Sequence, residues 1–141
     1  MIKVLFTILS VLMLHYSFAQ TSIYIKGSGF NNNSQRKLIL NGIDQNIPSG
    51  RGLCLTIIDA ESHQHISSKV YDTYISTSNA NNLASKLNSL NQKQIGILTS
   101  YDAWEANITK DLIRAARRLG LYKFASDKFT EDSRHPYASI F

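Results

Sequence analysis

Three charged side chains lie at the ends of predicted strands. Arg51 begins the most apolar segment, Asp102 ends a later one, and Arg134 precedes the last, with Tyr137 close behind it. A carboxylate accepts from neighbouring sugar hydroxyls, a guanidinium donates to hydroxyl or acetamido oxygens, and a ring such as Tyr137 or Trp104 can cover a pyranose face. The set indicates a carbohydrate site. Composition alone favours a plainer interpretation, in which Asp102 caps the approach to a helix and both arginines are surface charges.

Catalytic motifs are missing from the sequence: it has no GxSxG elbow, HExxH, CxxC or phosphate-binding loop. A carboxylate pair for glycoside cleavage could come from Asp72 and Asp102, which both end predicted strands, but the sequence does not show that they face each other. The single cysteine, Cys54, lies between two leucines, so we expect a buried thiol and no intramolecular disulfide. We therefore expect that the protein is not an enzyme.

One short segment has a composition that could bind a metal. His63 and His65 lie close to Asp59 and Glu61, which gives imidazole and carboxylate ligands within seven residues. All four crowd one polar connection, and no distant residue offers a further ligand. We interpret the segment as a solvated loop, and we expect no metal and no cofactor.

The chain is organised around residues 50–59, GRGLCLTIID. Its apolar run is almost continuous, which is typical of a strand covered on both faces, and its two glycines allow close backbone approach around Arg51. The glycines at positions 27 and 29 follow no phosphate-loop spacing and are interpreted as turn glycines. Alternating or apolar segments predict further strands at 22–26, 36–40, 65–71, 94–100 and 137–141.

Two helices are predicted between the later strands. The first follows a cap at Ser78 or Asn79 and carries an apolar face, and the second runs from a Thr109 cap to Leu119, with Gly120 as its stop. The inward positions are Leu83, Ala84, Leu87 and Leu90 in the first helix, and Leu112, Ile113, Ala116 and Leu119 in the second. The order of strands and helices predicts an α+β fold with mostly antiparallel pairing.

The N-terminus resembles a secretory leader. Lys3 precedes an apolar stretch that ends at Ser17-Phe18-Ala19, so we expect cleavage before Gln20 and a secreted protein with no membrane span. Removing residues 1–19 from the 141 leaves 122, enough for one domain, and lowers the formal charge from +5 to +4. That mildly basic charge suits a protein that meets acidic glycans or cell surfaces, although an ordinary solvated surface explains it as well, and we expect no nucleic-acid partner. Sequons at 32–34 and 107–109 would place both segments at the surface in a eukaryotic host.

Five segments together resemble a known family, the ILEI/PANDER domain. They are GRGLCLTIID (50–59), VYDTY (70–74), LTSYDAW (98–104), RRLGL (117–121) and SRHPYASIF (133–141). The resemblance covers residues 22–141 and predicts that residues 20–141 form one such domain. The family includes secreted interleukin-like EMT inducers and the stem domain of protein O-mannose N-acetylglucosaminyltransferase.

The resemblance implies two twisted antiparallel sheets flanked by two helices, with no catalytic activity. In the transferase stem, residues matching Arg51, Asp102 and Arg134 bind a terminal β-linked N-acetylglucosamine, and Tyr137 replaces the family's tryptophan. The partner would then be a glycan or glycoprotein. The alternative is a cytokine-like ligand that acts through a cell-surface protein receptor. The paired cysteines of the secreted members are missing here, which weakens the cytokine interpretation more than the lectin one.

Overall fold

The computed structural model describes residues 20–29, 35–124 and 134–141. The leader predicted at 1–19 and the sequon at 32–34 lie outside these ranges. The elements are β1 (Ile23–Lys26), β2 (Lys37–Leu40), β3 (Ile43–Asp44), β4 (Gly52–Asp59), β5 (His65–Tyr71), α2 (Thr77–Asn88), β6 (Gln94–Tyr101), α3 (Lys110–Arg118) and β7 (Ala138–Ile140).

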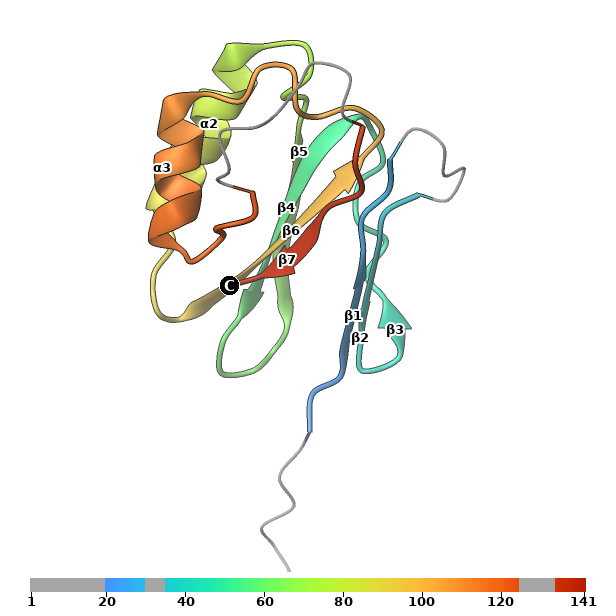
Figure 1. Cartoon of the computed structure of the whole chain (residues 1–141). Coiled ribbons are helices and arrows are strands. Elements are labelled where there is room, and N and C mark those ends of the chain that lie inside the picture. The colour runs from blue at the N-terminus through green and yellow to red at the C-terminus, as the bar shows by residue number, and fades with distance from the viewer. Residues whose placement is uncertain (1–19, 30–34, 125–133) are drawn as a thin grey trace, which may run out of the picture.

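The strands form two antiparallel sheets, with orders β1-β2-β3 and β5-β4-β6-β7. Figure 1 shows three layers: α2 and α3 lie on one side of the larger sheet, and the smaller sheet lies on the other. The predicted α+β fold is therefore confirmed. Within the described residues, neither helix has the length and apolar character needed to cross a membrane.

Strand β4 is buried on both faces, as its apolar run predicted. Leu53 and Leu55 pack into the core beneath the helices, whereas Ile58 packs with Leu38 and Ile97 between the two sheets. Each such side chain contributes roughly 1.5–3 kcal/mol when it leaves water. Covering β4 from both sides is thus what holds the three layers together.

The thiol of Cys54 is free and buried, as the sequence predicted. Burial raises the pKa of this thiol, although the nearby Arg36 opposes the rise. Arg36 is only 5% exposed, and its guanidinium donates to the carbonyl oxygens of Thr99, Gly50 and Gly52. This arginine therefore joins the smaller sheet to the end of the larger one.

Local signals explain most of the element boundaries. Asn41 and Gly42 have φ of 49° and 79°, the left-handed pair that closes the β2–β3 hairpin. Thr109 caps α3 as predicted, and its hydroxyl accepts from the N–H of Leu112. The predicted cap of α2 was wrong, because Ser76 accepts from the N–H of Ser78 and starts the helix earlier.

Gly52 occupies a position that no other residue fits without strain. Its φ is +103°, and an added Cβ would lie 2.3 Å from the carbonyl oxygen of Tyr71. Gly42 also has positive φ, +79°, but nothing lies within 4 Å of an added Cβ.

We expect Gly52→Ala to lower the free energy of unfolding by at least about 3 kcal/mol, because backbone strain and a backbone clash add together. The control Gly42→Ala should cost only about 1 kcal/mol, since strain acts alone. Urea unfolding followed by circular dichroism measures both losses. Equal losses in the two variants would contradict this account of Gly52.

Candidate functional site

Arg51 lies at the start of β4, and its partner lies just past the end of the neighbouring strand β5. Its Nε donates to both carboxylate oxygens of Asp72 at 3.2 Å, and its Nη2 donates to Oδ2 at 2.9 Å. The guanidinium also lies 4.7 Å from the ring centroid of Tyr74. The hydrogen bonds to Asp72 are the main reason why the pKa of Arg51 is raised above its ordinary value. This pairing fixes one edge of the site.

Asp102 follows β6 and has a left-handed backbone, with φ of 56°. The register that pairs Gly52 with Tyr101 places this turn beside the start of β4. Asp102 Oδ1 lies 3.7 Å from Nη1 of Arg134, which is an ion pair but too long for a hydrogen bond. Within the described part of the chain, this buried oxygen accepts no hydrogen bond.

The two ion pairs lie at the same end of the larger sheet, where β4 begins and β6 ends. These two strand ends are at the top of the sheet in Figure 1. Their side chains are between 29% and 37% exposed, and the charge of Asp102 also contributes to the raised pKa of Arg51. The structure thus places Arg51, Asp102 and Arg134 at one end of the larger sheet, and their role in binding stays a prediction. Alternating donors and acceptors of this kind suit a polar, uncharged ligand rich in hydroxyl and amide groups.

Trp104 does not offer the exposed ring face that was expected of it. It is 2% exposed and stacks on Phe124 with centroids 5.2 Å apart, and its Nε1 donates to the carbonyl oxygen of His135. Tyr137 is partly buried and packs against both rings. Burial also raises the pKa of Tyr137. Both residues therefore stabilise the core beneath Arg134.

Sequence reasoning missed the roles of Tyr74 and Asn107. Tyr74 contributes the ring beneath Arg51, although the only signal for it was its place in the segment VYDTY. Asn107, the first residue of the second sequon, is half-buried, and its amide donates to the carbonyl oxygen of Tyr74 at 2.5 Å. The segment of this sequon is thus only partly exposed.

The histidines of the β4–β5 connection have separate partners. His63 Nδ1 lies 2.8 Å from the hydroxyl of Thr21, and His65 Nε2 lies 2.8 Å from the hydroxyl of Ser68. In the described ranges, no group of three His, Cys, Asp or Glu side chains could hold a metal ion.

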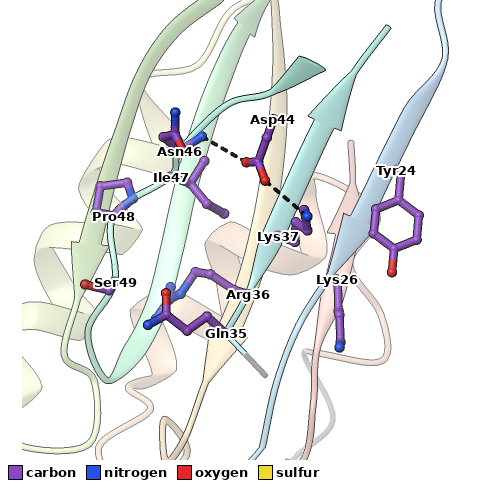
Figure 2. A pocket seen from close by; sticks show the side chains of 10 residues that line it. All are labelled: Tyr24, Lys26, Gln35, Arg36, Lys37, Asp44, Asn46, Ile47, Pro48 and Ser49. Atoms are coloured by element: carbon purple, nitrogen blue, oxygen red, sulfur yellow. Dashed lines mark hydrogen bonds and ion pairs between the residues drawn. The ribbon is translucent and has the colours of Figure 1, made fainter. Parts of the chain in front are cut away.

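A cavity of about 700 Å³ lies on the smaller sheet, and none of the four residues of the two ion pairs lines it. Figure 2 shows its lining from β1, β2 and the segment after β3, with Lys37 paired to Asp44 at 3.2 Å. Asp44 also accepts from the N–H of Asn46. On this wall Lys37 and Asn46 bind Asp44, whereas the buried Nε of Arg36 makes no hydrogen bond within the described residues. We take the strand-end cluster as the candidate site because it gathers two arginines and two carboxylates.

The fold and the strand-end cluster define a small α+β domain of two antiparallel sheets with paired arginines and aspartates at one sheet end. Residues 51–135 match the model of the family described as interleukin-like EMT inducer, ILEI. The match spans more than half of the chain and includes all four charged residues. The chain belongs to the ILEI family, which confirms the resemblance found in the sequence. A comparison with curated proteins finds no matching relative.

Glu105 follows the Asp102 turn and has an unusual environment for a carboxylate. Its side chain is 2% exposed. Burial raises its pKa above the ordinary value of 4.5, although the N–H groups of His135 and Trp104 oppose the rise. A carboxyl with a higher pKa in the folded chain stabilises the fold while protonated. This contribution is lost as the pH rises from 4.5 through the folded pKa.

We expect the free energy of unfolding of the wild type to fall relative to that of Glu105→Gln as the pH rises from about 4 to 7. Glutamine has a similar shape but no ionisable proton, so the difference between the proteins isolates this one carboxyl. Urea unfolding at several pH values measures it. Parallel pH profiles for the two proteins would show that the pKa of Glu105 is not raised.

Proposed function

We propose that the protein is a secreted, non-enzymatic carbohydrate-binding domain that recognises a β-linked N-acetylglucosamine-type sugar. The observation that carries the proposal is Asp102: a carboxylate with strained backbone, a buried oxygen that lacks a hydrogen bond in the described ranges, and an arginine 3.7 Å away. Backbone strain and unsatisfied buried acceptors concentrate at functional sites, and the rest of the Asp102 side chain, which is 33% exposed, is open to a ligand. Secretion rests on the leader pattern at residues 1–19.

Sugar recognition follows from the chemistry of the cluster. Asp102 accepts from ring hydroxyls, while the guanidinium groups of Arg51 and Arg134 donate to hydroxyl and acetamido oxygens. The four side chains are about one-third exposed, so the ligand lies on a shallow surface and displaces water that already binds these groups. Affinity for one sugar should be weak, with Kd on the order of 1 mM.

The engagement of Asp72 supports a binding role over glycoside cleavage. Cleavage needs two carboxyl groups facing the scissile bond, one as acid and one as base or nucleophile. Here both oxygens of Asp72 accept hydrogen bonds from Arg51. Its lone pairs are therefore directed to the protein and not to a substrate.

A second candidate function is that of a signalling ligand that acts through a protein receptor. The description of the family, interleukin-like EMT inducer, supports it. Such a ligand would use a protein surface in place of the strand-end cluster. Retained receptor binding by an Asp102→Ala variant would favour this second candidate over the first.

We expect Asp102→Ala and Arg134→Ala each to weaken binding of methyl β-N-acetylglucosaminide at least about tenfold, because each loses a charge-assisted hydrogen bond. The matched control is Arg114→Ala, which removes an exposed arginine on α3 that pairs with Asp111. NMR titration of the purified protein measures the affinities. If the folded wild type binds no glycan, or if both variants bind as well as the control, the carbohydrate proposal is wrong.

A further inference from the structure

We propose that Glu105 is a positioning residue: its buried carboxylate fixes the backbone next to Arg134 and so holds the guanidinium of Arg134 against Asp102. The consequence for sugar binding rests on the function proposed above. The effect on the placement of Arg134 does not, since it can be measured without a ligand.

Glu105 connects two segments that are far apart in the sequence. One carboxylate oxygen accepts from the N–H of His135 at 2.9 Å, and the other accepts from the N–H of Trp104 at 3.1 Å. The imidazole of His135 is 75% exposed and lies 3.6 Å from the same carboxylate. One buried side chain thus links the turn that carries Asp102 to the residue directly after Arg134.

Other contacts also fix the backbone of residues 134–137. The hydroxyl of Ser100 accepts from the N–H of Tyr137 at 2.7 Å and donates to the carbonyl oxygen of Ser28 at 3.1 Å. Gly29 lies so close that an added Cβ would be 2.2 Å from the carbonyl oxygen of Arg134. The glycine at 29 therefore permits the backbone to pack closely against Arg134, a role that the sequence did not reveal. Glu105 adds a hydrogen bond to the N–H of His135, the residue directly after Arg134.

The chemical identity of Glu105 favours a positioning role. A carboxylate that is 98% removed from solvent costs free energy, and an apolar side chain of similar volume would pack in its place with less cost. A carboxylate, however, offers one oxygen to the N–H of Trp104 and the other to the N–H of His135. The buried carboxylate of Glu105 thus lies where it fixes the backbone of His135, next to Arg134.

The test compares Glu105→Ala, Glu105→Gln and the control Glu61→Ala, which changes an exposed residue of the β4–β5 connection. The NMR signal of the Arg134 Nε–H group is recorded in the free protein. We expect Glu105→Ala to move this signal towards that of the exposed Arg114 and to weaken sugar binding about tenfold. Glu105→Gln keeps one acceptor and should have a smaller effect, and Glu61→Ala should have none.

An unchanged Arg134 signal in a folded Glu105→Ala protein would overturn the positioning role. If the alanine variant does not fold, Glu105→Gln decides: an Arg134 signal and sugar affinity equal to those of the wild type overturn the role, and a shift with weaker binding supports it. A wild type that binds no sugar, together with a shifted Arg134 signal in the variants, would overturn the carbohydrate function and leave the positioning role supported.

Discussion

The structure depends on the burial of β4 on both faces. Seven of its eight residues are buried, so an unpaired charge within that buried run would cost a large free energy. The charged residues of the site therefore lie beyond the strand ends, where side chains reach solvent. Arg51 precedes the buried run, and Asp72 and Asp102 follow the two strands that pair with it. The position of the candidate site is therefore a consequence of how the sheet is covered.

A single connection, between β6 and α3, joins both halves of that site. Glu105 binds the segment of Arg134, while the backbone N–H of Asn107 donates to Thr73 and its side chain donates to Tyr74. Thr73 in turn donates to the carbonyl oxygen of Trp104. Because these contacts are half-buried or buried, the connection behaves as part of the core. It holds two ion pairs that are themselves only partly protected from water.

The sequence predicted the larger elements because their signals are local. β4 and β5 have the bounds that their apolar and alternating patterns gave, and α3 has the predicted Thr109 cap. The start of α2 was missed because Ser76 and its polar neighbours are all suitable caps. The two-residue β3 is too short to show a pattern.

The candidate site was predictable only in part. Strand ends brought the charged residues together, since antiparallel pairing fixes which ends meet. The burial of Trp104 was not visible, because its covering partners Phe124 and Tyr137 come from distant parts of the chain. The burial of Arg36 could not be predicted for the same reason, because the carbonyl oxygens that accept from it lie on other strands.

The most direct test of the central claim is a map of backbone amide shifts during titration with methyl β-N-acetylglucosaminide. The account predicts that the largest changes cluster at the sheet end, around Arg51, Asp72, Asp102 and Arg134. Changes confined to the cavity on the smaller sheet, around Lys37 and Asp44, would contradict it. No change at sugar concentrations of roughly 50 mM would contradict it as well, because even a weak site would then be occupied.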